Sequence, residues 1–288
     1  MVFSGMLQAC GGLPRSRGCR MARVMKIAIA GAAGRMGRAL LGAVASADDL
    51  ALSGALVRPG HPAAGQDAGL MAGGAQGVSV STDPRAVIAG CDVLIDFTSP
   101  AATLAFAGLC AAAGRPVVIG TTGLSADDMD RLRAHAALIP LVVAPNTSVG
   151  VTLSLHLLEI AARVLADADA EIVESHHRHK LDAPSGTALA MGRAVAQARG
   201  RHLEDVAVYD RHARREARAE GSIGFASIRA GEIVGEHRVL LVGASERLEI
   251  AHVADDRRVF AEGALRAARF VHKAPAGLYD MRDVLGLR

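Results

Sequence analysis

The sequence offers little aromatic side-chain volume for building a hydrophobic core. It has no tryptophan, and aromatic residues make up 3% of its 288 residues, whereas hydrophobic residues make up 51%. The core must therefore consist of alanine, valine, leucine and isoleucine, with 32 glycines available for turns. Small side chains let helices lie close to a sheet, so this composition favours an α/β architecture. The length allows one large domain or two smaller ones.

Cysteine is also scarce and follows no pairing pattern. The chain has four cysteines and no C-x-x-C motif. We therefore expect free thiols in a reducing compartment, which indicates a cytoplasmic location. The sequence also lacks any uncharged apolar run of about 18 residues, so we expect no membrane-spanning segment.

Acidic residues are absent from the first 25 positions, which contain four arginines. Of the 32 lysines and arginines, 28 remain in the rest of the chain, against 29 aspartates and glutamates. This nearly neutral body does not support a general attraction to nucleic acid, so we expect no nucleic-acid partner. We expect residues 1–24 to form a disordered extension. The alternative is that they are included only because the start was assigned too far upstream, since Met21 and Met25 both lie just before the first apolar run.

Apolar runs alternate with helical patterns over the first half of the chain. Strand-like runs lie at 25–30, 50–57, 92–97, 115–123 and 139–150. Ser99 and Pro100 predict a helix that starts with a capping hydroxyl and ends at Gly114. This alternation predicts a Rossmann-like, doubly wound parallel sheet up to about Thr147.

The pattern changes in the second half. A long apolar helix at 151–166 leads to a strand at 170–175, a basic cluster, and a helix from about Gly186 to Ala198. Three strand-like runs between 222 and 254 are joined by short turns, which favours antiparallel pairing, and a helix follows at 260–272. We therefore expect a smaller α+β domain with a mixed, mostly antiparallel sheet.

A glycine-rich turn, "GAAGRMG", places Gly31, Gly34 and Gly37 between the first strand and its helix. Glycine permits a tight turn, a close approach of the backbone to a pyrophosphate, and close packing of the helix on the strand. The N–H groups at the start of that helix favour phosphates. The spacing is G-x-x-G-x-x-G, and an ordinary glycine-rich turn is the alternative to a dinucleotide site.

The choice of dinucleotide is expected to be made near the end of the second strand. A carboxylate there would bind the ribose hydroxyls of NAD, and an arginine would accommodate the 2′-phosphate of NADP. The segment "GALVRPG" has no acidic residue and contains Arg58. We therefore predict NADPH as the preferred cofactor, with NADH possible and Arg35 as a second contact.

The segment "ESHHRHKLDAPSGTA", residues 174–188, concentrates three histidines, an arginine and a lysine in five positions. Arg178 and Lys180 disfavour a metal cation, and adjacent histidines on a strand point to opposite faces, so we expect no metal site. A nucleic-acid patch would need stacking aromatics or a longer basic stripe. A solvated charged loop is the remaining alternative.

The residues that follow the cluster favour a site for a small anion. Ser185 can cap a helix whose first residues, Gly186 and Thr187, offer backbone N–H groups and a hydroxyl to a carboxylate. A histidine and a lysine beside other cations are suitable proton donors. The pattern therefore predicts a small ligand with more than one carboxylate.

These motifs together resemble the 4-hydroxy-tetrahydrodipicolinate reductase (dihydrodipicolinate reductase) family. The resemblance runs from about Met25 to the C-terminus, and its most specific part is the "HHRHK-x-DAPSGTA" string. The strings that carry it are "AGAAGRMGRAL", "IDFTSP", "VIGTTG", "APNTSVG", "ESHHRHKLDAPSGTALAMG", "IGFASIRAGEIVGEH" and "YDMRDVL". It implies NAD(P)H-dependent reduction of a cyclic, unsaturated dicarboxylate to tetrahydrodipicolinate, in lysine and diaminopimelate biosynthesis.

The resemblance also implies roles for individual residues. His176 and Lys180 match the family's catalytic proton donors, and His177, Gly186 and Thr187 match its substrate contacts. The matching cofactor contacts, together with Arg58, are Gly31, Ala32, Ala33, Gly34, Arg35, Met36, Gly120, Thr121, Thr122, Ala144, Pro145, Asn146 and Thr147.

The family resemblance suggests a discontinuous domain boundary. Residues 25–147 and 258–288 would form the dinucleotide-binding domain, and residues 148–257 the domain for substrate binding and oligomerisation, which implies a homotetramer. Members that use both cofactors usually carry a glutamate before the matching arginine, whereas this chain has Val57. That difference agrees with a preference for NADPH.

Two other functions fit a dinucleotide turn. One is a different Rossmann reductase of an amino-acid pathway. The other is an NADPH-binding redox sensor without turnover, which predicts a partner-binding module such as a helix-turn-helix, and the sequence shows no such module.

Overall fold

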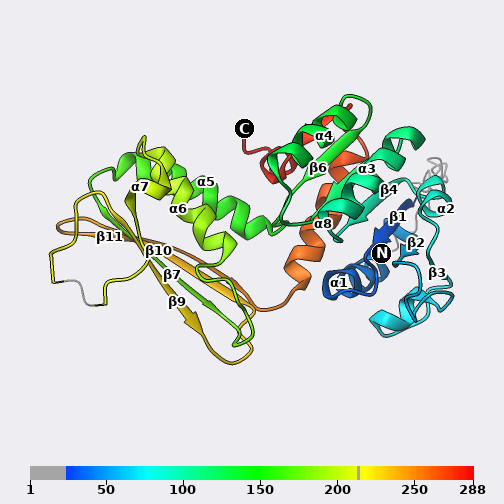
Figure 1. Cartoon of the computed structure of the whole chain (residues 1–288), viewed down its shortest axis with the longest axis horizontal. Helices are drawn as coiled ribbons and strands as arrows, with labels where there is room; N and C mark the ends of the chain where they lie inside the picture. The colour runs from blue at the N-terminus through cyan, green and yellow to red at the C-terminus, as the bar shows by residue number, and fades with distance from the viewer. Residues whose placement is uncertain (1–23, 213–214) are drawn as a thin grey trace, which may run out of the picture.

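The structure is a computed structural model that describes residues 24–212 and 215–288. Of the predicted N-terminal extension, residues 1–23 lie outside the described residues. The described chain forms two lobes, each built on one β-sheet (Figure 1).

The first lobe contains a fully parallel sheet, as the sequence predicted, and two of its seven strands, β3 and β12, were not among the predicted runs. Its strand order is β12-β6-β5-β4-β1-β2-β3. The strands are β1 (Met25–Ala30), β2 (Leu50–Leu56), β3 (Val80–Ser81), β4 (Val93–Asp96), β5 (Val117–Ile119), β6 (Pro140–Val143) and β12 (Gly277–Tyr279). The order reverses between β1 and β4, and ligands of doubly wound sheets bind at such a reversal.

Helices cover both faces of this sheet and enclose two apolar cores. They are α1 (Arg35–Ala45), the 3-10 turn η1 (Ala68–Ala72), α2 (Pro84–Ala89), α3 (Pro100–Ala113), α4 (Ala126–Ala136), α8 (Arg258–Val271) and α9 (Met281–Leu285). Helix α3 begins at Pro100 and ends at Gly114, whose φ of 62° suits glycine. The predicted cap is wrong in one detail, because the Ser99 hydroxyl makes no capping hydrogen bond within the described chain.

The second lobe contains a five-stranded mixed sheet, with the order β11-β10-β7-β9-β8. Its strands are β7 (Asp169–His176), β8 (Ala207–Val208), β9 (Ile223–Arg229), β10 (Gly235–Val242) and β11 (Arg247–Ala254). The helices are α5 (Val149–Val164), α6 (Gly186–Ala198) and α7 (Leu203–Val206). They lie on one face of the sheet, and no described helix covers the other face, which is called the uncovered face below (Figure 1).

Strand pairing in the second lobe departs from the prediction at one position. The hairpin of β10 and β11 is antiparallel, as expected, but β9 and β10 are not neighbours. Strand β7 lies between them, parallel to β9 and antiparallel to β10. The connection from β9 to β10 therefore crosses the end of β7, where the N–H of Ala230 donates to the carbonyl of His176. This crossing places the basic cluster beneath the connection.

The last part of the chain returns to the first lobe. Apolar side chains of α8 belong to the same core as those of β1 and α1, and β12 extends the parallel sheet next to β6. This arrangement supports the predicted boundaries at residues 147 and 258, which remain our proposal. In the part of the chain that the structure describes, no helix is long and apolar enough to cross a membrane.

Candidate active site

Two cavities open along the carboxyl edge of the parallel sheet. The glycine-loop cavity, of about 650 Å³, lies over the ends of β1, β2 and β4, and its walls include Gly31, Gly34, Arg58 and Thr98. The interlobe cavity, of about 790 Å³, lies between the lobes, and its walls include Thr122, Asn146, His176, Lys180 and Thr187. Together they cover the edge at which a dinucleotide binds to a doubly wound sheet.

The backbone of the glycine turn is packed so closely that a residue larger than glycine would not fit. Such a turn, without side chains in the way, lets a pyrophosphate approach the backbone. A Cβ on Gly37 would lie 2.2 Å from the carbonyl oxygen of Gly31, and Gly31 itself has a φ of 80°. The N-cap residue of α1, Gly34, lines the cavity, and the free N–H groups at the start of a helix stabilise a phosphate. Arg58 lines the same cavity, and none of the lining residues in the described chain is acidic.

The predicted cofactor residues divide between the two cavities. Gly31, Ala33, Gly34 and Arg58 line the glycine-loop cavity, and Thr122, Ala144, Pro145 and Asn146 line the interlobe cavity. The remaining predicted cofactor residues do not line either cavity. Three of them, Ala32, Thr121 and Thr147, are buried. Met36 packs against the core, Gly120 lies against the Phe97 ring, and Arg35 is exposed. Arg35, the predicted second contact, is thus outside the cavity that Arg58 lines.

Thr121 is held inward by a buried carboxylate that the sequence did not assign to the site. Asp96, at the end of β4, accepts hydrogen bonds from Thr98 Oγ1 at 2.6 Å and Thr103 Oγ1 at 2.5 Å. The Thr103 hydroxyl also lies 2.8 Å from Thr121 Oγ1. Asp96 therefore joins the loop after β4 to the loop after β5.

The interlobe cavity brings the two predicted proton donors to the predicted anion site. His176 ends β7, Lys180 lies in the following loop, and Gly186 and Thr187 begin α6; all four line the cavity. The Ser185 hydroxyl accepts the N–H of Ala188 and so caps α6. The first N–H groups of a helix have no acceptor within it, so this helix start can bind a carboxylate.

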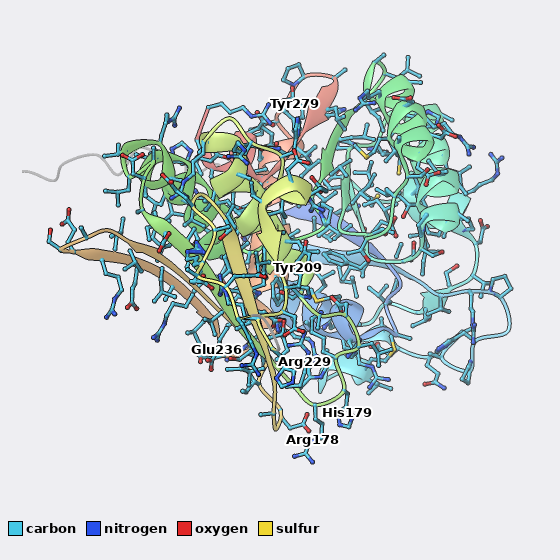
Figure 2. All side chains as sticks on the ribbon, turned by 60° about the vertical axis from the view of Figure 1, so that its left-hand side comes forward. Arg178, His179, Tyr209, Arg229, Glu236 and Tyr279 are labelled. Atoms are coloured by element: carbon cyan, nitrogen blue, oxygen red, sulfur yellow. The ribbon has the colours of Figure 1, made fainter. Side chains whose placement is uncertain are left out.

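Other members of the cluster point elsewhere. Arg178 and His179 are exposed at the tip of the loop, away from the body of the lobe (Figure 2). His179 lies 3.8 Å from the carboxylate of Glu232. His177 is half-buried and is not among the residues that line the interlobe cavity. Strand β7 ends at His176, so His177 belongs to the following loop, and the strand alternation on which the sequence prediction relied does not apply to this pair.

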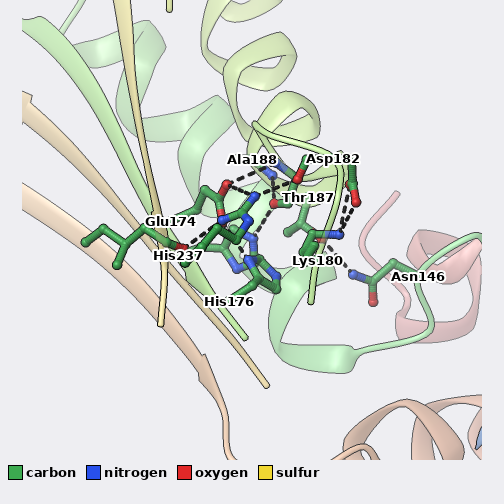
Figure 3. Close-up of polar contacts among 11 residues, drawn as sticks. Asn146, Glu174, His176, Lys180, Asp182, Thr187, Ala188 and His237 are labelled. Carbon is green, nitrogen blue, oxygen red and sulfur yellow. Dashed lines mark hydrogen bonds and ion pairs between the residues drawn. The ribbon is translucent and has the colours of Figure 1, made fainter. Parts of the chain in front are cut away.

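A buried network behind the cavity wall was missed by the sequence analysis (Figure 3). The Glu174 carboxylate lies 2.5 Å from His176 Nδ1 and receives two hydrogen bonds from Arg229 of β9, at 2.9 and 2.8 Å. Burial alone would raise the pKa of Glu174, but bonds from Arg229, Ser227 and His176 lower it to about 2. The period-two spacing of Glu174 and His176 was the available signal, because it puts both on one face of a strand.

Two more histidines lie along the same face of the second sheet. The rings of His176 and His237 are 5.1 Å apart, and His237 Nε2 lies 2.9 Å from the Ser185 hydroxyl. Burial lowers the pKa of His237 to about 4, and burial also lowers the pKa of His252, next to Ser148. Within the described chain, no three His, Cys, Asp or Glu side chains are grouped so as to hold a metal ion.

Lys180 is paired with a carboxylate inside the interlobe cavity. Its Nζ lies 2.8 Å from each carboxylate oxygen of Asp182, and the lysine side chain is 22% exposed. Asn146 Nδ2 donates to Thr187 Oγ1 at 3.1 Å, and this bond joins the loop after β6 to the start of α6. The two lobes are therefore in direct contact at the wall of this cavity.

Comparison with protein families covers nearly all of the described chain. Residues 25–147 match the family model described as dihydrodipicolinate reductase, N-terminus, and residues 150–285 match the one described as dihydrodipicolinate reductase, C-terminus. A 4-hydroxy-tetrahydrodipicolinate reductase of Nitrosomonas europaea is 52% identical, over 92% of this chain and 99% of that protein. One of Thiobacillus denitrificans is 54% identical over the same shares.

Solved structures share the fold. A dipicolinate-bound dihydrodipicolinate reductase from Paenisporosarcina sp. TG-14 has a TM-score of 0.72 at 25% identity, covering 89% of this chain and 97% of that one. A probable dehydrogenase from Thermotoga maritima has a TM-score of 0.61 at 14% identity, covering 90% of this chain and 92% of that one, which shows a common fold alone.

Proposed function

Because the chain belongs to the dihydrodipicolinate reductase family, we propose that it reduces 4-hydroxy-tetrahydrodipicolinate to tetrahydrodipicolinate with NAD(P)H, in lysine and diaminopimelate biosynthesis. One observation carries this proposal beyond the family match. A single cavity is lined by two proton donors, by a helix start suited to a carboxylate, and by loops at the carboxyl edge of the dinucleotide-type sheet. A dicarboxylate in that cavity would lie next to both a proton donor and the edge of the sheet at which the cofactor is proposed to bind.

The cofactor is proposed to extend from the glycine-loop cavity to the interlobe cavity. When bound, the reduced nicotinamide supplies the hydride. The turn from Gly31 to Gly34 would hold the pyrophosphate, and Thr122 with Ala144 to Asn146 would face the nicotinamide end. We propose NADPH as the preferred form, because Arg58 lines the cavity just after β2, where a 2′-phosphate would lie, and none of the described residues that line this cavity is acidic.

The substrate is proposed to lie against the start of α6. The N–H groups of Gly186 and Thr187 and the Thr187 hydroxyl would bind one carboxylate, with the positive charge of Lys180 close by. His176 or Lys180 would then donate the proton that completes the reduction. We propose that this proton comes from the second lobe, because the one described carboxylate on the opposite wall, that of Asp280, accepts the backbone N–H of Arg282 and pairs with Arg288.

We further propose a homotetramer and a cytoplasmic location. The uncovered face of the second sheet carries exposed apolar side chains, including Ile228, Val242 and Val253, which suit contact with another copy of the chain. The location is proposed from the family's biosynthetic reaction and from the free thiols of Cys91 and Cys110.

The test is to mix the protein with NADPH and the condensation product of pyruvate and aspartate semialdehyde, and to follow the loss of absorbance. We expect turnover, and about 10²-fold lower kcat in His176→Ala and in Lys180→Ala, with cofactor affinity nearly unchanged. A different Rossmann reductase would not turn over this substrate, and a redox sensor would bind NADPH without oxidising it. No turnover by the unmodified protein would refute the proposed function.

A further inference from the structure

The Glu174 carboxylate lies directly behind the wall of the interlobe cavity. Its side chain is only 1% exposed, and its two oxygens contact different parts of the site. Oε2 lies 2.5 Å from His176 Nδ1, and Oε1 accepts the backbone N–H of Ser185 at 3.3 Å. One buried group therefore touches both the proposed proton donor and the cap of the helix proposed to bind the substrate carboxylate.

Arg229 compensates the buried charge of Glu174. Its two terminal nitrogens bind the two carboxylate oxygens, and one of them also donates to the carbonyl of Asp182 at 2.6 Å. A planar guanidinium suits such two-point binding, and the pKa of Glu174 is held at about 2. The carboxylate is therefore ionised over the whole pH range in which an enzyme is assayed.

An ionised carboxylate can only accept a hydrogen bond, so the hydrogen of the Glu174–His176 contact belongs to His176 Nδ1. The Nε2 atom is then the ring nitrogen left to exchange a proton with a ligand in the cavity. The neighbouring His237 does not supply this function. Its Nε2 lies 2.9 Å from the Ser185 hydroxyl, and His237 is not among the residues that line the interlobe cavity.

We propose that Glu174, held by Arg229, is a positioning residue that fixes the tautomer of His176 and the start of helix α6 as one unit. The proton donor and the N–H groups for the substrate carboxylate would thereby keep a constant relative position, which transition-state stabilisation requires. This inference rests on the proposed function, because it assigns His176 the proton transfer in that reaction.

The proposal predicts in which direction activity changes with pH. The charged and titratable groups facing His176 are Glu174 on its own strand, Arg229 on β9, His237 on β10, and Lys180 with its partner Asp182 in the loop. Burial is the largest influence and lowers the pKa of His176; Glu174 raises it, and Lys180 and Arg229 lower it further. If protonated His176 donates the proton, activity is lost as pH rises through this pKa.

Two substitutions should therefore displace the alkaline limb of the pH profile in opposite directions. Glu174→Gln removes the negative charge, so the limb should move to lower pH, and kcat at neutral pH should fall by about 10²-fold. Arg229→Gln removes a positive charge, so the limb should move to higher pH by roughly one unit. Loss of packing alone would lower activity in both variants without opposite shifts.

A matched control is available on the same strand. Glu171 also pairs with arginines, Arg211 and Arg218, but faces the other side of β7 and does not line the cavity. Glu171→Gln should leave the pH profile unmoved. NADPH affinity, measured by fluorescence titration, should be unchanged in all three variants, because the glycine-loop cavity lies in the other lobe.

The outcomes separate this inference from the proposed function. If the unmodified protein turns over the substrate but the two limbs stay in place or move the same way, the role of Glu174 is refuted and the activity stands. If the unmodified protein shows no turnover, the proposed function fails first. If circular dichroism shows that Glu174→Gln does not fold, Arg229→Gln decides alone. The proposal is then overturned if the alkaline limb of its pH profile does not move to higher pH.

Discussion

Removal of Arg58 should change cofactor selectivity without affecting the rest of the site. Arg58 follows β2, is exposed, and lines the glycine-loop cavity beside Val57 and Pro59. A hydrogen bond to a charged group contributes about 1.5–3 kcal/mol, and solvent exposure reduces such a contact to roughly 1–2 kcal/mol. Since 1.4 kcal/mol is about tenfold, Arg58→Ala should lower kcat/KM for NADPH roughly five- to thirtyfold.

The assay compares NADPH and NADH on the same variant, with both cofactors below their KM. NADH lacks the 2′-phosphate, so its kcat/KM should be nearly unchanged in Arg58→Ala. The NADPH preference of the unmodified protein should also weaken as salt is added, because the contact is exposed and therefore screened. Val57→Glu is the complementary change, since it supplies the carboxylate that the ribose hydroxyls of NADH would bind. It should raise the use of NADH.

Arg266→Ala serves as the control, because Arg266 is an exposed arginine on α8 that lines neither cavity. An equal loss for NADPH and NADH in Arg58→Ala would mean that Arg58 contacts a part common to both cofactors. No loss for either would mean that Arg58 does not contact the cofactor. Both results would refute the assignment of the 2′-phosphate position.

Three further changes test the architecture. Gly37→Ala should abolish cofactor binding in a fluorescence titration, because its Cβ would lie 2.2 Å from the carbonyl oxygen of Gly31; retained binding would contradict the tight turn. Gly263→Ala should reduce the free energy of unfolding by about 3 kcal/mol in urea, because its Cβ would lie 1.8 Å from the carbonyl oxygen of Thr147; an unchanged midpoint would mean that the backbone there can shift. Buried His237 has its pKa lowered to about 4, so the unfolded chain binds a proton below about pH 6.5 that the native state does not. Stability should therefore fall between about pH 6.5 and 4, by up to about 3 kcal/mol from this group, and His237→Gln should remove part of that slope in urea titrations at different pH values; an identical slope would contradict the assignment.

Local signals predicted the elements of this protein well because they depend on neighbouring residues. Helix α6 begins at Gly186 and ends at Ala198, as the Ser185 cap and the apolar spacing indicated. Strand neighbours depend instead on contacts between distant residues, which a short turn does not determine. That is why β9 and β10 were expected to pair, although β7 lies between them.

The candidate site shows the same division between local and distant information. His176, Lys180, Gly186 and Thr187 lie within one segment of the sequence, and the fold brings all of them to one cavity. The partner of Glu174 is Arg229, 55 residues further along the chain, and nothing in the spacing of either residue indicates the other. Only the parallel pairing of β7 with β9 brings them together.

The two proposed proton donors differ in how firmly each is held, and this difference bears on their roles. His176 is bound to a buried carboxylate whose charge Arg229 already compensates, so a substrate carboxylate has no means of displacing Glu174. Lys180 is bound to Asp182, whose side chain is 59% exposed, and exposed ion pairs are weak. An incoming carboxylate can compete with Asp182 for Lys180 at little cost. The geometry therefore favours His176 as the fixed proton donor. It favours Lys180 as a cation that exchanges its ion pair with Asp182 for one with the substrate carboxylate.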